Sequence, residues 1–309
     1  MWPVLAFISA LCLGFYDISK KVALRNNKVI DVLAISICAS ALFLSIPLIL
    51  SRLYPEMMVS TYFYVPALDA TAHLYTLLKS AIVLSSWVFA YISLKHLPIS
   101  VVSPMQATRP MWTLIGALLI FGERLNAWQW VGVVFAIGSI FVFSLGATKT
   151  TNHPSLIKSH KYYYICLALA ILIGACSGLY DKYLMRRYDH NAVQVYYTFY
   201  QAAMMLIVWT VDRIYNRSSG EKLFTLPAKR TILPILFISV FLIISDNVYM
   251  LALRDPDSMI AVVSTIRRGG AIIGFAYGLI FLRENDPMRK ILCMLGILAG
   301  LICLALGSI

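Results

Sequence analysis

Apolar stretches follow one another along the chain, and short polar connections separate them. Each stretch is about 20 residues long, which is what an α-helix needs to cross about 30 Å of hydrocarbon. The pattern predicts ten membrane-spanning helices, at about 2–22, 31–50, 73–94, 99–121, 127–146, 162–184, 191–212, 232–252, 258–281 and 289–307. Because the connections are short, we expect no separate soluble domain.

A repeat divides the chain into two halves. Leu13-Gly14-Phe15-Tyr16-Asp17 returns as Ser177-Gly178-Leu179-Tyr180-Asp181, and Val101-Val102-Ser103 with Glu123 returns as Val262-Val263-Ser264 with Glu284. Each half holds five predicted spans, and because five is odd the second half must enter the membrane upside down. We therefore expect an all-α integral membrane protein of ten transmembrane helices, built as two inverted five-helix repeats. The repeats are expected at 1–147 and 162–309, joined by a polar linker at 148–161.

The composition supports a membrane protein and excludes most other classes. Hydrophobic residues make up 60% of the chain and charged residues 13%, with a mean hydropathy of +0.79, which lies outside the range of soluble globular proteins. The net charge is +12, but the basic residues lie mostly in short connections, so we expect no nucleic-acid partner. The six cysteines lie in apolar spans without a CxxC pair, and we expect no metal, disulfide framework or cofactor.

The lysines and arginines of the connections are distributed unevenly. If those at the ends of the spans are included, with Lys20 and Lys21 treated as loop residues, sixteen belong to the connections after the odd-numbered spans and five to those after the even-numbered spans. Cytoplasmic loops carry the excess of Lys and Arg, so the count places both termini outside the cytoplasm.

Several elements resemble those of one transporter family. Pro110 precedes Phe121-Gly122-Glu123-Arg124-Leu125 at the end of the fourth span, and Phe281-Leu282-Arg283-Glu284 is a weaker echo in the second half. Together with the ten-span repeat, these elements resemble the EamA-like transporters of the drug/metabolite transporter superfamily. The resemblance implies transport of a small metabolite and leaves its identity open. It also implies that both termini are cytoplasmic, against the charge count, and both orientations stay open here.

Three arginines fall inside predicted spans. Arg109 lies midway along 99–121, and Arg267 and Arg268 lie in the corresponding span 258–281. An arginine at this depth is energetically costly and normally faces a wet cavity or a partner. Because its planar fork suits carboxylate or phosphate, we expect these residues to bind an anionic substrate group. The alternative is internal ion pairing with Asp17, Asp181 or Asp246.

Acidic residues are candidates for coupling and for the substrate site. Asp17 and Asp181 are the duplicated acids, and each could be a proton-coupling site or form a local ion pair with a nearby lysine, Lys20 or Lys182. Asp246 lies more centrally in its span, so we expect it to line a substrate cavity or to neutralise an arginine.

Amide and aromatic side chains complete the expected cavity. Interfacial belts use the same residue types, so a structural role is the alternative for each one. The expected lining residues are Gln106, Trp112, Tyr197, Gln201, Tyr249 and Trp87.

Small residues recur at four-residue spacing and indicate close helix contacts. The series are Gly174 with Gly178, Gly270 with Gly274 and Gly278, and Gly296 with Gly300. Glu123 and Glu284 lie at helix ends, where we expect structural or interfacial anchors.

The sequence therefore favours a secondary active transporter that moves a small anionic or zwitterionic metabolite by alternating access. A proton or ion gradient could drive it, because no GxxxxGK[ST] motif for nucleotide binding occurs. The alternatives are an intramembrane enzyme, for which HExxH and GxSxG motifs are missing, and a non-transporting membrane scaffold. The expected partners are the substrate and the lipid bilayer, in a bacterial inner (plasma) membrane; the oligomeric state is left open.

Overall fold

The computed structural model describes residues 1–24, 27–96, 108–148, 161–217, 229–270, 273 and 287–307. Within these ranges the regular secondary structure is helical throughout. The helices are α1 (Trp2–Leu24), α2 (Val29–Leu53), α3 (Pro55–Val59), α4 (Ala70–His96), α6 (Arg109–Phe121), α7 (Ala127–Thr148), α8 (Lys161–Met185), α9 (His190–Arg217), α10 (Lys229–Arg254), α11 (Ile260–Arg268) and α13 (Pro287–Leu306).

Each of the ten predicted ranges overlaps one of these helices, although the fourth and ninth ranges are described only in part. Five helices, α1, α2, α4, α8 and α10, are long and apolar enough to cross a membrane. Shorter apolar helices lie at Arg109–Phe121, Ala127–Ser139 and Leu295–Leu304. The short helix α3 was not predicted, and it lies in the connection expected at 51–72.

Local hydrogen bonds explain where several helices begin and end. Asn126 and Gln129 cap α7 reciprocally, since each side chain accepts a hydrogen bond from the other residue's backbone N–H, at 2.9 and 3.0 Å. The Asp189 carboxylate accepts the backbone N–H of Ala192 at the start of α9. Gly122 follows α6 with φ of 61°, the left-handed conformation that terminates helices and that glycine adopts without strain.

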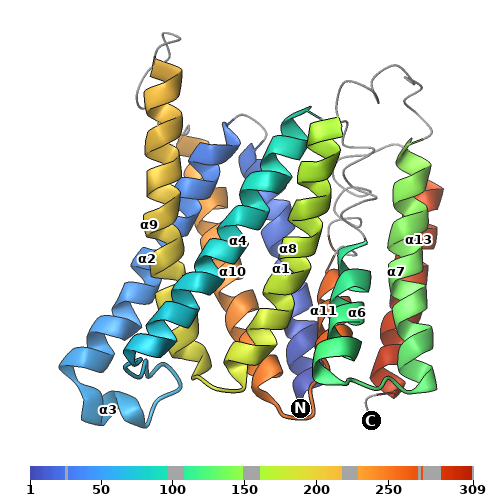
Figure 1. Cartoon of the computed structure of the whole chain (residues 1–309), viewed down its shortest axis with the longest axis horizontal. Helices are drawn as coiled ribbons and strands as arrows, with labels where there is room; N and C mark the ends of the chain where they lie inside the picture. The colour runs from blue at the N-terminus through green and yellow to red at the C-terminus, as the bar shows by residue number, and fades with distance from the viewer. Residues whose placement is uncertain are drawn as a thin grey trace.

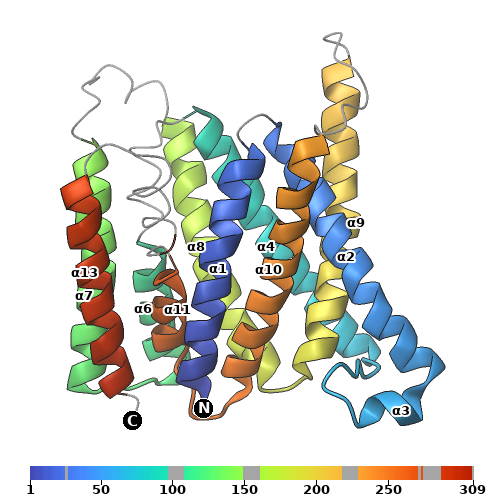
Figure 2. The ribbon, with the colours of Figure 1, turned by 180° about the vertical axis from the view of Figure 1, so that it is seen from behind.

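The long helices form two layers. Helices α9, α4, α8, α6 and α7 face the viewer in Figure 1, and α2, α10, α1, α11 and α13 face the viewer in Figure 2. Within a layer α1 packs along α10 and α4 along α8, whereas α2–α9, α6–α11 and α7–α13 pack between layers. Both termini lie at the lower end of the bundle in Figure 1, called here the termini face; the other end is the opposite face.

Glycines permit two of the close helix crossings, as predicted. A Cβ at Gly14 of α1 would lie 2.7 Å from the carbonyl oxygen of Gly270, after α11. A Cβ at Gly300 of α13 would lie 2.7 Å from the carbonyl oxygen of Gly132 in α7. The predicted role of Gly270 and Gly300 in close contacts is therefore confirmed, whereas Gly274 and Gly278 lie outside the described residues.

Glu123 connects three helices through its carboxylate, since it follows α6 and binds groups of α8 and α11. Its carboxylate accepts the backbone N–H groups of Ile260 and Ala261, at 2.6 and 3.1 Å, and so caps α11. Lys182 donates to the same carboxylate at 2.9 Å, and both side chains are buried. The structural role expected for Glu123 is confirmed, while Glu284 lies outside the described residues. The expected local pair of Asp181 with Lys182 is wrong, because Lys182 turns toward Glu123 and Ser258.

Candidate functional site

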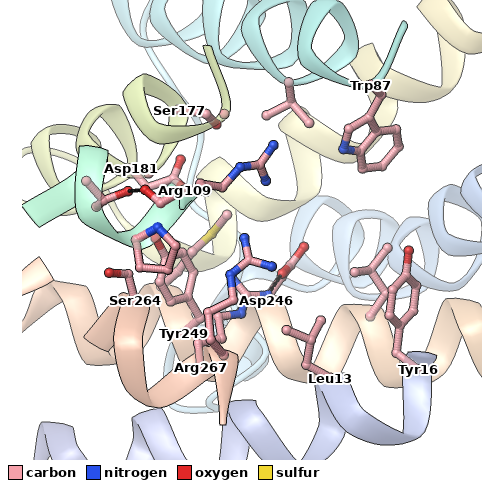
Figure 3. A pocket seen from close by; sticks show the side chains of 18 of the residues that line it. Leu13, Tyr16, Trp87, Arg109, Ser177, Asp181, Asp246, Tyr249, Ser264 and Arg267 are labelled. Carbon is pink, nitrogen blue, oxygen red and sulfur yellow. Dashed lines mark hydrogen bonds and ion pairs between the residues drawn. The ribbon is translucent and has the colours of Figure 1, made fainter. Parts of the chain in front are cut away.

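A cavity of about 470 Å³ lies between the two layers. Eight helices line it, α1, α2, α4, α6, α8, α9, α10 and α11, so both halves of the chain contribute. Its α1 and α4 lining residues come from the later parts of these helices, so the cavity extends toward the opposite face. Figure 3 shows side chains from both layers converging on it.

The cavity carries an excess of positive charge. Three acidic side chains line it, Asp17, Asp181 and Asp246. Five basic side chains line it, Lys20, Lys79, Arg109, Arg267 and Arg268. At neutral pH the lining therefore has two more positive than negative charges. In a site of low dielectric constant such an excess attracts anions.

Lys79 and Asp181 form one of two ion pairs in the cavity wall. Lys79 lies on α4 and Asp181 on α8, and their side chains are only 3% and 10% exposed. The Lys79 ammonium also lies 4.5 Å from the centroid of the Tyr197 ring, within the range of a cation–π contact. The charge of Lys79 is thus compensated on two sides by the protein itself.

Arg267 and Asp246 form the second pair. Arg267 Nη2 donates to a carboxylate oxygen of Asp246 and, at 3.3 Å, to the hydroxyl of Ser245. The guanidinium carbon lies 4.2 Å from the centroid of the Tyr249 ring. Figure 3 shows the Arg267 and Tyr249 side chains side by side at the cavity. Like Lys79, Arg267 combines a carboxylate partner with a tyrosine ring.

Arg109 and Arg268 lack such partners. Arg109 Nη2 donates to the hydroxyl of Ser86 and to the carbonyl oxygen of Ala170, both at 3.2 Å, and these acceptors are uncharged. Within the described part of the chain, neither arginine has a carboxylate within 4.0 Å. Arg268 is exposed and has no hydrogen-bond partner among those residues. These two arginines therefore differ from Lys79 and Arg267, and Asp17 attracts Arg268 only over a distance longer than that of an ion pair.

The other predicted site residues divide into three groups. Trp87, Tyr197 and Tyr249 line the cavity, as do the acids Asp17, Asp181 and Asp246. Gln201 is buried in a small side pocket that Asp246 and Tyr197 also line. Trp112 is 46% exposed and is not part of the cavity lining, and Gln106 lies outside the described residues.

Lys79, Lys20 and Tyr16 were missed as cavity residues by the sequence analysis. Lys79 could have been predicted as a cavity residue, because an ionisable residue inside a predicted apolar span is expected to face a cavity or a partner. Its partner could not be found from spacing, because 102 positions separate Lys79 from Asp181. Lys20 and Tyr16 adjoin the duplicated Asp17, so the repeat motif itself pointed to them.

Part of the chain matches a known protein family. The model of the EamA-like transporter family matches residues 1–145. The first half of the chain is EamA-like. This confirms the resemblance predicted from the sequence over residues 1–145, and the long apolar helices support an integral membrane protein.

Two individual proteins are similar to this chain. UDP-galactose transporter homolog 1 of Kluyveromyces lactis is 25% identical over 73 residues, which cover 24% of this chain and 22% of the relative. The match thus spans about a fifth of that relative's length, and since the relative is a yeast protein it gives the expected bacterial membrane no support. A protein of known crystal structure is similar along 99% of this chain and 96% of its own, with a TM-score of 0.74 and 11% identity. At that identity the likeness concerns the fold alone.

Proposed function

We propose that this EamA-like protein is a secondary active transporter that moves a small anionic metabolite by alternating access. The observation that carries the proposal is the pair of arginines, Arg109 and Arg268, that have no ion-pair partner among the described residues, at one cavity between the two halves. A charge without an ion-pair partner inside the membrane is costly, so a cavity lined by two such arginines is suited to a ligand that neutralises them.

The shape and lining of the cavity fit a small molecule. A volume of about 470 Å³ lies within the range of small-molecule sites, which typically combine apolar walls with a few polar groups. Trp87, Tyr16 and Tyr249 supply aromatic surface beside the charged groups (Figure 3). Asp17 lies in the same lining without an ion-pair partner within 4.0 Å among the described residues, so a zwitterion with an amino group is the alternative ligand.

The helix contacts support the ten-helix inverted repeat of the proposal. In such a repeat each helix of the first half corresponds to one of the second half: α1 to α8, α2 to α9, α4 to α10, α6 to α11 and α7 to α13. When each helix is replaced by its counterpart, the α1–α10 contact becomes the α8–α4 contact. The same exchange turns α6–α8 into α11–α1 and α4–α9 into α10–α2, and all six contacts are present. In Figure 1, α1 starts at the termini face and α8 at the opposite face. A two-fold axis in the membrane plane between the layers relates halves in this way.

We assign proton or ion coupling to Asp17 rather than to Asp181. Asp181 is buried against Lys79, whereas Asp17 lies in the exposed part of the lining. Lys20 and Arg268 attract Asp17 electrostatically, but no described residue pairs with it within 4.0 Å. A carboxyl group without such a direct ion pair can exchange its proton as the cavity opens and closes. Replacing Asp17 with asparagine should make uptake independent of an imposed proton gradient. Unchanged gradient dependence in Asp17→Asn would contradict this assignment.

The opposite face, toward which the cavity extends, is cytoplasmic if the Lys and Arg bias sets the orientation. The loop between α3 and α4 lies at the termini face in Figure 1, and Phe63 in this loop is 65% exposed. A cysteine placed there should then react with an impermeant maleimide added to intact cells. No reaction would instead favour cytoplasmic termini.

The charge class of the substrate can be tested with purified protein in proteoliposomes. The probes are radiolabelled UDP-galactose, inorganic phosphate and malate as anions, alanine as a zwitterion, galactose as a neutral sugar and free lysine as a cation. We expect uptake of one or more anions and none of galactose or lysine. Uptake of alanine alone would favour the zwitterion, and uptake of galactose or lysine without any anion would contradict the proposal.

A further inference from the structure

Gly174 makes room for the guanidinium group of Arg109. A Cβ built on Gly174 would lie 2.6 Å from Arg109 Nε and nearer still to Cζ and Nη2. The three atoms nearest to that Cβ therefore all belong to this one guanidinium. The sequence pattern Gly174-xxx-Gly178 suggested a contact between helix backbones, but the space at Gly174 is filled by an arginine side chain.

Two hydrogen bonds hold the guanidinium in this position. Nη2 donates to Ala170 O on α8 and to Ser86 Oγ on α4, and the Ser86 hydroxyl itself donates to Ala170 O at 2.8 Å. Nε is enclosed and has no partner. Nη1 donates to no described residue, and Arg109 lines the cavity, so Nη1 is the part of the group left for a ligand.

We infer that Gly174, with Ser86 and Ala170, is the seat that fixes the orientation of Arg109 toward the substrate. The inference rests on the proposed function, because it gives Arg109 a ligand. An arginine side chain has several rotatable bonds, and binding an anion through a fixed donor avoids the entropy cost of ordering it. A side chain at position 174 would push the planar group off α8 and turn Nη1 away from its present direction.

Other glycines provide the controls. A Cβ at Gly138 of α7, outside the cavity, would meet nothing within 4 Å. A Cβ at Gly178, one turn after Gly174 and in the same lining, would come no closer than 3.9 Å to its nearest neighbour, Tyr249 Oη. Gly138→Ala therefore controls for the added methyl group, and Gly178→Ala controls for a slightly narrower cavity without touching Arg109.

The test measures KM and maximal rate in proteoliposomes with the anionic probe that the wild-type protein takes up fastest. Gly174→Ala should raise KM by about ten-fold, which corresponds to the loss of one charge-assisted hydrogen bond. Gly138→Ala should match the wild type, and Gly178→Ala should raise KM less than Gly174→Ala. Equal effects of Gly174→Ala and Gly178→Ala would overturn the seat, since narrowing of the cavity would then account for both.

A double-mutant cycle separates the seat from helix packing. Lysine has no planar group to seat, so adding Gly174→Ala to Arg109→Lys should change KM by less than about two-fold. If Gly174→Ala costs as much with lysine at 109 as with arginine, the glycine acts through helix packing and the seat is refuted. If Arg109→Ala transports like the wild type, Arg109 does not bind the substrate, and this part of the proposed function is refuted. Impaired Arg109→Ala with unimpaired Gly174→Ala would refute the seat alone.

Discussion

Four of the five cations of the cavity fall into two kinds that differ in the partners that the protein provides. Lys79 and Arg267 each have a carboxylate and a tyrosine ring, whereas Arg109 has only neutral hydrogen-bond acceptors and Arg268 has no ion-pair or hydrogen-bond partner among the described residues. A charge inside the protein needs an opposite charge nearby, and the protein supplies a carboxylate for Lys79 and for Arg267, the first kind. In the second kind the compensation is left to a ligand. The first kind is expected to govern stability and the second to govern affinity.

The largest effect is expected from breaking the Lys79–Asp181 pair. Lys79→Met leaves the Asp181 carboxylate buried without its partner, which typically costs about 3–5 kcal/mol of folding stability. Chemical unfolding in detergent should show the loss. The double variant Lys79→Met/Asp181→Leu, which removes both charges, should recover much of the stability. A single variant as stable as the wild type would show that the pair does not stabilise the fold.

A smaller effect is expected from Arg109→Lys. Lysine keeps the positive charge and loses the planar fork, so transport of the anionic probe should fall by about ten-fold, the equivalent of one charge-assisted hydrogen bond. Stability should change little, because Arg109 has no carboxylate partner among the described residues. Initial uptake rates and melting temperatures of the same preparations provide the measurement. A lower melting temperature with unchanged uptake would show that Arg109 stabilises the fold, as expected of Lys79 and Arg267, and does not bind the substrate.

The smallest effect is expected from Trp112→Ala. Trp112 is 46% exposed, so its side chain faces out of the bundle rather than into the cavity. Uptake and KM should stay within about two-fold of the wild type, as expected for an exposed substitution remote from the site. Trp87→Ala, which removes a ring from the cavity lining, is the matched comparison and should impair uptake. An equal loss in both variants would contradict the placement of Trp112.

The main helices could be predicted from the sequence because each membrane crossing needs a long apolar stretch. The short helix α3 could not, since five residues in a polar connection carry no such periodicity. The arginines on the fourth and ninth spans were predictable from their cost in hydrocarbon. Which of these arginines has an ion-pair partner could not be predicted, because the partner lies on another helix. Asp246 and Arg267 are an example, 21 positions apart on α10 and α11.

Spacing along one helix also misplaced a residue. Arg109 and Trp112 are three positions apart, so their side chains point about 60° apart around the axis. The buried face of α6 contains Pro110, Thr113 and Ala117, which leaves Trp112 on the outer side. Arg109 still reaches the cavity, because its long side chain extends onto Gly174. A spacing rule ignores side-chain length, so it assigned both residues to one face.

Replacing Arg109 and Arg268 with alanine, singly and together, tests the role of the uncompensated arginines most directly. Uptake of the anionic probe and melting temperature are measured on the same purified proteins, with Arg267→Ala as the matched variant of a paired arginine. We expect Arg109→Ala and Arg268→Ala each to lower uptake by more than about ten-fold at nearly unchanged melting temperature, whereas Arg267→Ala lowers the melting temperature as well. Wild-type uptake in both single variants, together with lower melting temperatures, would contradict an anion site and give these arginines a structural role.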